Sequence, residues 1–581
     1  MNNKKFLRTD MPLRTAITWL TAVFLSMLLL TGCGKKAVEE IQVEVPELSE
    51  EEKAQYVSAD GYVDPAAYGA AGDGVTDDTE ALQMAIESGY NVRLQDCTYF
   101  ISGESYLKVS DKSDFHMEGG IIHREADDSN SSLFVLKNCS DCSFSNMQIY
   151  SEFSCKDILV PKNHKRPSET KSSNVLAFSG TGNSNILFQD NSFACMGSDY
   201  WFNATEDAPW QNITVDGWTS SSTLMPMYTQ CVTGLTVKNA DVALNPGCGD
   251  GDHCMYVCYK TSDVLIEDST FTGNDTEELM GAVVVLTFHG GDEKKDTQPK
   301  NIEINNCSIN ALTGRAIYCE EGTDIRVTDS SVIQQTAAEQ AATGQEATGQ
   351  EAAEQAATGQ MATGQTAAEQ KATEQAAAEQ TSTGQTAVEQ TATGQKAAEQ
   401  PATGQEVAEK TDTEQTQGEN DESSASGEGS EGNVNTPIFG YGSYTFNRCE
   451  IQAVDTVFEG LDSLCLTDCS VQGAGTNALI TGVANVEADG CEFLINGGAA
   501  VYMNESSHPQ HVYENCSFVK NGDALAYLFS DRSADGQITL KDCRVDVGNQ
   551  WFSYDGAKKS TSGYILENTE ISNSLGMVMG E

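Results

Sequence analysis

One short motif recurs through most of the chain and constrains its fold more than any other feature. The motif is an Asn or Asp, a small residue, any residue and then a large apolar residue. Clear copies begin at Asp141, Asp190, Asn239, Asp268, Asn306, Asp329, Asp468, Asn515, Asp542 and Asn568. Looser copies begin at Arg448 and Gly490, and from Arg448 onward successive copies are separated by 20, 22, 25, 27 and 26 residues. An even period of this length is typical of a solenoid.

Each copy follows a short alternating run of apolar and polar residues, such as NIEIN or QITLK, and a second apolar run comes after it. Alternation with a period of two indicates β-strands. Strands that recur once per repeat can pair with the next repeat and point their apolar side chains into one continuous core. The Asn or Asp suits a tight corner because it tolerates the left-handed αL conformation. The sequence therefore predicts an all-β parallel β-helix over residues 59–334 and 437–581. A β-sandwich would not need so even a spacing.

Seven cysteines fall in one slot of the repeat, directly after the predicted corner residue. They are Cys142, Cys307, Cys449, Cys469, Cys491, Cys516 and Cys543. Stacked turns would place them in a column, where a small apolar thiol packs well. Adjacent turns lie only about 4.8 Å apart, which leaves disulfides open, but the spacing follows the repeat rather than a disulfide framework. We expect buried thiols and no metal site, because the spacing does not give the paired CxxC clusters of zinc proteins.

The first 58 residues have the layout of an export and anchoring segment. Residues 1–32 contain a basic leader and the apolar run TAITWLTAVFLSMLLL, which together predict a signal peptide. The run ends in LLTGC, which resembles the lipobox of bacterial lipoproteins. That resemblance implies that Cys33 carries a lipid and that residues 33–58 are a polar tether at the extracytoplasmic side of the cell membrane. An ordinary signal peptide or a transmembrane helix is the alternative, although the apolar run is short for a span.

Residues 335–436 form a low-complexity insert. From Thr336 to about Gln415 the sequence repeats every five residues, as in TAAEQ and AATGQ, and this period fits neither a helix nor a strand. Its apolar residues are nearly all Ala, so we expect a disordered or weakly helical segment. The insert carries about −15 of the formal net charge of −52. A chain this acidic is not expected to bind nucleic acid, because phosphate contacts need clustered Lys and Arg.

The segment after the tether, VDPAAYGAAGDGVTDDTEALQMAIESG, contains an expected helix. Asp77 can cap this helix and Glu80 can complete a capping box. Its apolar face, suited to closing the open end of a coil, consists of Leu82, Ala85 and Ile86. The segment closely resembles the N-terminal motif of the pectate-lyase superfamily, whose members are right-handed parallel β-helices. The matching residues are Tyr68 to Ala70, Gly72 to Gly74, Thr76 to Thr79, and Ala81 with Leu82. The superfamily includes hydrolases, lyases, isomerising transferases and non-enzymatic adhesins, so the resemblance implies a fold more than an activity.

Residues 248–257, CGDGDHCMYV, are the main candidate for a reaction centre. The stretch resembles the GDDCIAI-like strand of polygalacturonases, in which aspartates supply the acid and base for hydrolysis with inversion. Gly251 and Asp252 match that strand, but His253 stands where the second acid is expected. Asp250, Asp252 and His253 have three open readings: a general acid/base group, a Ca²⁺ site or a solvated turn.

Two residues on later turns match other parts of the polygalacturonase pattern. His289 precedes a glycine in TFHGG, and Arg315 in GRAIY matches the arginine of an RIK motif, with Tyr318 in the region of the lysine. We count Arg315 with the candidate catalytic residues and His289 with the substrate-binding residues. The alternative for Arg315 is a surface arginine paired with Glu320 or Glu321.

Three of the five tryptophans, Trp201, Trp210 and Trp218, lie one or two coils before the candidate centre. Aromatic rings beside acids suit stacking on sugars, whereas a packed loop lid is the alternative. Two functions are left open. One is a lipid-anchored β-helix that acts on a polysaccharide, by glycosidic hydrolysis or uronate elimination. The other is a non-catalytic β-helix that binds glycan or a surface component. Neither requires a cofactor, although a lyase would use Ca²⁺ or an arginine to neutralise the uronate.

Overall fold

The computed structural model describes residues 43–581 except for residue 104 and a set of internal and terminal ranges. These ranges are 126–131, 152–175, 223–224, 245–252, 274–281, 288–296, 312–313, 320–323, 336–435, 475–477, 497–498, 504–508, 521–526, 532–535, 556–562 and 580–581. The chain divides into two compact units, and every described residue belongs to the unit that joins Met1–Ala357 with Gly432–Glu581. The other unit, Thr358–Glu431, and most of the predicted insert lie outside the described residues.

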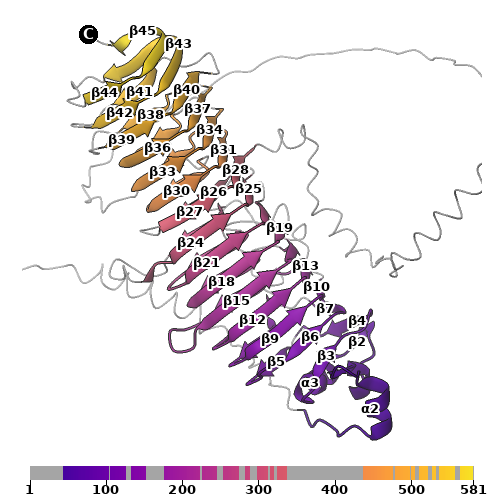
Figure 1. Cartoon of the computed structure of the whole chain (residues 1–581). Helices are drawn as coiled ribbons and strands as arrows, with labels where there is room; N and C mark the ends of the chain where they lie inside the picture. Colours follow the sequence, from indigo (N-terminus) through magenta and orange to yellow (C-terminus); the bar gives the residue numbers. More distant parts are fainter. Residues whose placement is uncertain are drawn as a thin grey trace, which may run out of the picture. The chain divides into compact units, whose positions relative to one another are not determined.

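Among the described residues, 16 strands form one sheet and 29 strands form another, and every strand pair is parallel (Figure 1). The first sheet consists of β1 (Tyr62–Val63), β3 (Asn91–Arg93), β6 (His116–Glu118), β9 (Ser140–Ser145), β12 (Ser184–Gln189), β15 (Trp210–Asp216), β18 (Val232–Lys238), β21 (Ser262–Glu267), β24 (Lys300–Asn305), β27 (Asp324–Thr328), β30 (Ser443–Asn447), β33 (Ser463–Thr467), β36 (Asn485–Asp489), β39 (Gln510–Glu514), β42 (Gln537–Lys541) and β44 (Gly563–Glu567).

The second sheet consists of β2 (Asp73–Asp77), β4 (Thr98–Ile101), β5 (Leu107–Ser110), β7 (Ile121–Arg124), β8 (Ser132–Lys137), β10 (Gln148–Ser151), β11 (Leu176–Thr181), β13 (Ser192–Ala194), β14 (Ser198–Asn203), β16 (Thr219–Ser221), β17 (Met227–Gln230), β19 (Asp241–Ala243), β20 (Met255–Cys258), β22 (Thr270–Thr272), β23 (Ala282–Thr287), β25 (Ser308–Ala311), β26 (Arg315–Cys319), β28 (Ser331–Gln334), β29 (Ile438–Gly440), β31 (Glu450–Ala453), β32 (Phe458–Glu459), β34 (Ser470–Gly473), β35 (Ile480–Thr481), β37 (Glu492–Ile495), β38 (Val501–Met503), β40 (Ser517–Lys520), β41 (Tyr527–Asp531), β43 (Arg544–Asp555) and β45 (Glu570–Met579).

A typical turn of the coil contributes one strand to the first sheet and two to the second, as in β18, β19 and β20, and each strand pairs with its counterpart in the next turn. The apolar side chains of successive turns form one buried core. The right-handed parallel β-helix predicted from the sequence is confirmed.

The N-terminal end of the coil is closed by α3 (Thr79–Glu87), as expected. Its buried apolar face includes Leu82, Ala85 and Ile86. The predicted cap is confirmed in part. The N-cap residue is Asp78, whose side chain makes no capping hydrogen bond, but Asp77 Oδ1 accepts a hydrogen bond from the N–H of Thr79, the first residue of the helix (3.1 Å). The Asp78 carboxylate instead accepts hydrogen bonds from the backbone N–H groups of Ala71 (2.6 Å) and Phe100 (3.3 Å). These bonds tie the segment before the helix to the first turn.

Part of the expected tether packs against this cap. Residues 43–58 include α2 (Glu50–Tyr56), which Ser49 and Glu52 begin with a capping box. Leu48 is buried in the core cluster, and a short 3₁₀ helix, η1 (Pro65–Tyr68), follows. No helix among the described residues is long and apolar enough to cross a membrane.

The corners have the αL conformation that the motif predicts. All twelve motif positions have φ between 49° and 66°. The corner side chains also link neighbouring turns, because Asn306 Nδ2 donates to Asp268 Oδ1 (2.6 Å) and Asn568 Nδ2 donates to Asp542 Oδ1 (2.5 Å). The Asn or Asp therefore both forms the corner and cross-links the stack.

One copy of the motif is out of register, so the placement of Cys142 in the cysteine column is wrong. Cys142 lies inside β9 and pairs with Ile186 of β12. The corner of that turn is Asn146 (φ 56°), and Met147 fills the slot after it. Asp141 misled the prediction because it too is αL, in a second row of polar residues in which Asn185 donates to Asp141 (2.9 Å).

The other six cysteines do hold one slot, directly after an αL corner. They are free and buried: Cys307, Cys449, Cys469, Cys491, Cys516 and Cys543. Their thiols donate to backbone carbonyls, as from Cys449 Sγ to Val327 O (3.4 Å) of the preceding turn. Ser330 fills the slot in another turn and donates from its hydroxyl in the same way, to Thr328 O (2.7 Å). The prediction of buried thiols is confirmed for these six residues.

The coil continues across residues 336–435 without a change of register. β27 pairs with β30 and β28 pairs with β31. Arg448 takes the corner position of the first turn after the gap, and its guanidinium donates to both carboxylate oxygens of Asp329, at 2.5 and 2.6 Å. The two halves of the fold are thus joined by strand pairing and by an ion pair.

Candidate functional site

The partly exposed positions of the second sheet carry a row of aromatic residues in consecutive turns. Trp201 of β14 pairs with Tyr228 of β17, which pairs with Tyr256 of β20. Two turns later, Tyr318 of β26 pairs with Phe439 of β29. Apart from Tyr228, which is 8% exposed, these side chains are intermediate in exposure, whereas their neighbours along the strands point into the core. We call these five residues the aromatic strip.

The rings of the strip stack on one another along the coil. Ring centroids are 4.2 Å apart for Trp201 and Tyr228, 5.7 Å for Tyr228 and Tyr256, and 5.9 Å for Tyr318 and Phe439, with interplanar angles of 16°, 12° and 14°. The strip is interrupted once, at β23, where Val285 pairs with both Tyr256 and Tyr318. We call this position the strip break. The two tyrosines that flank it are two strand spacings apart, or about 10 Å.

Arg315 lies on the far side of the strip break. Its side chain is 7% exposed, and its guanidinium carbon lies 4.0 Å from the ring centroid of Phe439 and 5.0 Å from that of Tyr318. Arg315 Nε is buried and has no hydrogen-bond partner, and the guanidinium forms no ion pair with a described residue. Burial lowers the pKa of this guanidinium. Glu320 and Glu321, the alternative partners, lie outside the described residues.

A buried cation without a carboxylate is a costly arrangement, and stacking on aromatic faces offsets only part of its desolvation. An anion that entered from solvent would supply the missing charge-assisted hydrogen bonds. The nearest carboxylate in the same column is Glu459 of β32, which pairs with Phe439 one turn further on. That carboxylate accepts a hydrogen bond from Thr436 Oγ1 (2.9 Å).

His253 lies on the near side of the strip break. It is 5% exposed, and its ring centroid lies 5.4 Å from that of Tyr256. An imidazole titrates near neutral pH and suits proton transfer. Asp250 and Asp252 lie outside the described residues, so their distance to His253 is not part of the described geometry. The structure places His253 and Arg315 on opposite sides of one turn.

The stacking role expected of two tryptophans is wrong. Trp210 and Trp218 have no exposed surface, and each points into the core. Trp210 Nε1 donates to Gly180 O (2.8 Å). Only Trp201 reaches the partly exposed face. The alternation of β15 decides the outcome for Trp210. The αL residue Asn212 interrupts this alternation, so Trp210 lies on the same side of the strand as the buried Ile213 and Val215.

Trp218 is held by a buried carboxyl group that the sequence analysis missed. Asp199 has no exposed surface and accepts hydrogen bonds from Trp218 Nε1 (2.9 Å) and Ser222 Oγ (2.5 Å). Burial raises the pKa of Asp199 to about 7. This group lies two residues before Trp201 and anchors the start of the strip. An acid within the otherwise apolar run of β14 was the available signal.

The remaining predicted site residues lie outside the described residues. They are His289 and the lipid-attachment residue Cys33. Among the described residues, no group of three or more His, Cys, Asp or Glu is arranged to hold a metal ion.

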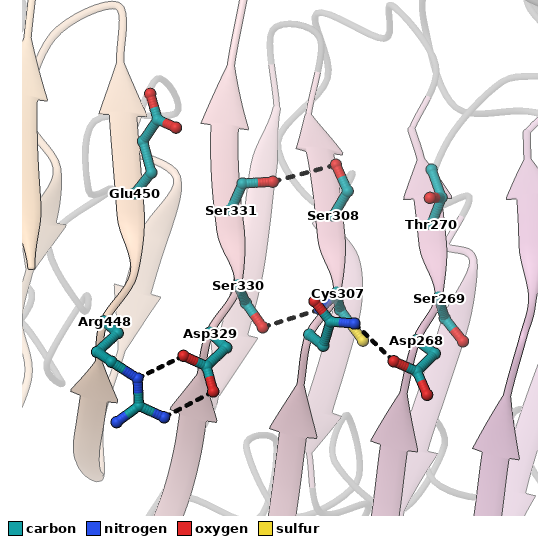
Figure 2. Close-up of a pocket in the computed structure, with 11 residues that line it drawn as sticks. Asp268, Ser269, Thr270, Cys307, Ser308, Asp329, Ser330, Ser331, Arg448 and Glu450 are labelled. Atoms are coloured by element: carbon teal, nitrogen blue, oxygen red, sulfur yellow. Dashed lines mark hydrogen bonds and ion pairs between the residues drawn. The ribbon is translucent and has the colours of Figure 1, made fainter.

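A concave region lies elsewhere, over the corners on either side of residues 336–435 (Figure 2). Its volume is about 480 Å³. The polar and charged side chains that line it are largely hydrogen-bonded to each other. Asn306 donates to Asp268, and Arg448 donates to Asp329. These contacts hold neighbouring turns together. The described residues of this region include no buried cation that lacks an ion pair with a described residue, as Arg315 does at the strip break. The strip break is therefore the stronger candidate site.

Sequence reasoning found His253, Arg315 and Trp201 but missed the residues that connect them. Tyr256, Tyr228 and Phe439 were not singled out. The signal was present, because each of these residues is the outward position of a strand in the same column. Aligning the outward positions of successive repeats, rather than the buried ones, would have found the strip.

No family model matches the chain, and no curated protein matches it. Similar solved structures include the A-module of mannuronan C-5 epimerase AlgE6 from Azotobacter vinelandii, at 11% identity over 88% of this chain and 98% of that chain (TM-score 0.35). Another is endo-xylogalacturonan hydrolase from Aspergillus tubingensis, at 10% identity over 87% and 100% (TM-score 0.34). A third is PfbA, a surface adhesin of Streptococcus pneumoniae, at 11% identity over 90% and 92% (TM-score 0.34). These names include enzymes that act on polysaccharides and an adhesin. At such low identities and TM-scores the likenesses carry no inference about chemistry.

Proposed function

We propose that the protein binds an acidic polysaccharide across the strip break. The observation that carries this proposal is Arg315, a buried guanidinium that forms no ion pair with a described carboxylate, beside an interrupted row of aromatic rings. In a chain with a formal net charge of −52, a cation that forms no ion pair with the described residues is suited to an anion from outside.

The strip break has the dimensions of a sugar subsite. Within the strip, neighbouring rings fill one strand spacing each, whereas Tyr256 and Tyr318 are separated by two. A pyranose ring over Val285 would lie about 5 Å from each tyrosine ring, which is a normal separation for apolar ring faces in contact. A carboxylate on that sugar or its neighbour would meet the planar donors of Arg315.

We further propose that the bound polysaccharide is cleaved beside His253, by hydrolysis or by uronate elimination. Asp250, Asp252 and His253 directly precede β20, so they belong to the turn that carries Tyr256. In hydrolysis one acidic group would protonate the leaving oxygen while another activates water. In elimination His253 would take the C5 proton, and Arg315 or a Ca²⁺ ion would neutralise the uronate.

A non-catalytic glycan-binding or adhesion role is the second candidate, and one observation favours it. The one described carboxylate in the column of the aromatic strip is Glu459, so the described part of this column holds no acid pair for hydrolysis. We also propose that Cys33 anchors the protein to the cell membrane, which would place the polysaccharide at the cell surface.

Binding is tested with Arg315→Met in the chain that lacks residues 1–33. The probes are polygalacturonate and its fully methyl-esterified form, which differ in charge. We expect Arg315→Met to weaken polygalacturonate binding about 10- to 100-fold, because it removes charge-assisted hydrogen bonds, and to leave the ester unaffected. The matched control is Arg326→Met, since Arg326 is an arginine of the first sheet paired with Glu303 (2.9 Å). Equal losses for both probes, or for both variants, would overturn the proposal.

Cleavage is tested on the same chain by assaying new reducing ends and the absorbance of unsaturated products. Reducing ends without absorbance indicate hydrolysis, and both together indicate elimination. We expect Asp252→Asn and His253→Ala to abolish either signal without changing affinity by more than about tenfold. Tight binding with no product from any acidic polysaccharide would leave the non-catalytic role.

A further inference from the structure

Five cysteines stand in the same slot of five consecutive turns at the C-terminal end of the coil. They are Cys449, Cys469, Cys491, Cys516 and Cys543, which we call the thiol row. We propose that the thiol row is an oxidation site, in which Cys516 and Cys543 join as a disulfide by exchange with a low-molecular-weight disulfide. This inference is independent of polysaccharide binding.

The backbone holds the members of the thiol row in register. Each cysteine carbonyl accepts a hydrogen bond from the next turn, as from Arg544 N to Cys516 O (2.9 Å). Stacked Cα atoms in such a ladder are about 4.8 Å apart, which lies within the range of about 4.4–6.8 Å for disulfides. Disulfides need Cβ atoms about 3.5–4.5 Å apart, so bond formation requires the two corners to approach by up to about 1 Å from the strand spacing.

The sulfur atoms already lie against the neighbouring turn. Cys491 Sγ accepts a hydrogen bond from Cys469 N at 3.4 Å. Cys543 Sγ donates to Tyr513 O (3.3 Å), in the turn that carries Cys516. The register therefore sets the sulfur of Cys543 next to the turn of its partner.

One end of the thiol row is chemically distinct. The neighbouring Cys516 thiol lowers the pKa of the Cys543 thiol to about 7, whereas the pKa of Cys491 is raised to about 12. The thiolate is the form that attacks disulfides, and the lowered pKa makes Cys543 the better nucleophile of the pair. Its side chain is only 3% exposed, so a small disulfide reaches it when the last turns open locally. Its sulfur attacks the small disulfide, forms a mixed disulfide and releases one small thiolate. Cys516, after losing its proton to that thiolate, attacks the sulfur of Cys543 and releases the second, so two protein thiols are oxidised and one small disulfide is reduced to two thiols.

The same slot contains a built-in control. Cys307 has the same corner geometry, but the slots above and below it hold Ser269 and Ser330 (Figure 2). Cys307 N donates to Ser330 Oγ at 3.0 Å, so a hydroxyl occupies the place of the neighbouring sulfur. Cys307 therefore has no partner thiol in the column. Serine at this slot is also compatible with the fold, which makes Cys→Ser substitutions suitable tests.

The experiment treats the chain lacking residues 1–33 with oxidised glutathione at pH 7.5, digests it without reduction and maps disulfides by mass spectrometry. We expect the peptides of Cys516 and Cys543 to be cross-linked in most molecules and Cys307 to stay alkylatable. Cys516→Ser should stop the cross-link and leave Cys543 with a glutathione adduct. Ser330→Cys should bring Cys307 into a new cross-link with the thiol introduced at position 330.

Two results would overturn the proposal. One is that all five thiols of the row remain alkylatable under conditions that oxidise the cysteines of exposed control peptides. The other is a failure of Ser330→Cys to cross-link Cys307 although circular dichroism shows an unchanged β-helix. Reductant should restore the free thiols and lower the thermal unfolding midpoint of the oxidised protein to its starting value, because a cross-link between turns restricts the unfolded chain.

Discussion

The turns before residue 335 and the turns after residue 436 obey one repeat but use it differently. In the first part, the slot after the corner holds residues of many sizes: Met147, Asn191, Trp218, Ala240, Ser269, Cys307 and Ser330. In the second part the same slot holds a cysteine in five turns running. Strands of the first sheet begin 20 to 27 residues apart after the gap (443, 463, 485, 510, 537, 563), but up to 44 apart before it (140, 184).

This difference teaches where a solenoid places its site. Uniform turns stack identical residues, which favours stability and leaves little variety on the outer face. Irregular turns bring different side chains to the same position, and they contain Arg315, His253 and the aromatic strip up to Tyr318. Four predictions test this division of roles, beginning with the largest effect.

Truncating a buried side chain in the irregular turns should destabilise the protein as much as it does in the core of a globular domain. We expect Trp210→Ala to reduce the free energy of unfolding by about 3–5 kcal/mol, because it removes a fully buried side chain and its hydrogen bond to Gly180. Trp201→Ala, on the partly exposed strip, should cost less than about 1 kcal/mol. Denaturant unfolding followed by fluorescence measures both. Equal losses would show that the strip, too, is structural.

Asp199 should make the irregular turns sensitive to pH. Its pKa is raised from 3.8 to about 7, so between these values the folded state keeps a proton that the unfolded state has lost. The contribution of this group to stability is therefore greatest below pH 4, falls as pH rises to 7 and is constant above it, with a total change on the order of 4 kcal/mol. Asp199→Asn should remove this slope from the stability–pH curve. Parallel curves for the two proteins would contradict the assignment.

Ligand binding should depend on the strip only where it is interrupted. We expect Tyr256→Ala and Tyr318→Ala each to weaken polygalacturonate binding about tenfold, or about 1.4 kcal/mol. The control is Tyr502→Ala, since Tyr502 of β38 holds the same column in the regular turns. Isothermal titration compares the three. A comparable loss for Tyr502 would move the site away from the strip break.

The smallest effect is expected where the two parts meet. Arg448 is an exposed αL residue where other corners carry Asn, Asp or Gly, and its ion pair with Asp329 is open to solvent and salt. Arg448→Asn should leave the thermal unfolding midpoint nearly unchanged, because Asn tolerates αL and can bond to Asp329 as Asn306 does to Asp268. A large decrease would mean that the junction depends on this ion pair rather than on strand pairing.

Much of the fold could be predicted from the sequence, because the repeat follows from a backbone requirement: each turn needs a residue that tolerates the αL conformation. An αL corner restricts residue choice at each turn, so Asp190, Asn239 and the other corner positions were identifiable. The error at Asp141 arose because a second αL position in the same turn has the same residue preference. Sequence alone could not separate two rows of corners that obey one physical rule.

The site was less predictable, because local irregularities in a strand decide whether a given side chain points into the core or toward solvent. Trp201 and Trp210 are nine residues apart in one aromatic segment, yet one is partly exposed and the other is buried. Arg315 was identified by resemblance, but its lack of a partner depends on which residues surround it in three dimensions. The break in the strip at Val285 is visible only once the strand register is known.

The unbroken register at the junction has a consequence for how the chain can change its length. One turn earlier the link between β25 and β26 spans residues 312–314, whereas the link between β28 and β29 spans residues 335–437. Loop-closure entropy grows only with the logarithm of loop length, so the longer link costs about 3 kcal/mol more and each further doubling about 0.6 kcal/mol. Gain or loss of pentapeptide repeats in this link should therefore change the stability of the β-helix little. The same reasoning predicts that the β-helix tolerates insertion of an unrelated sequence at this position.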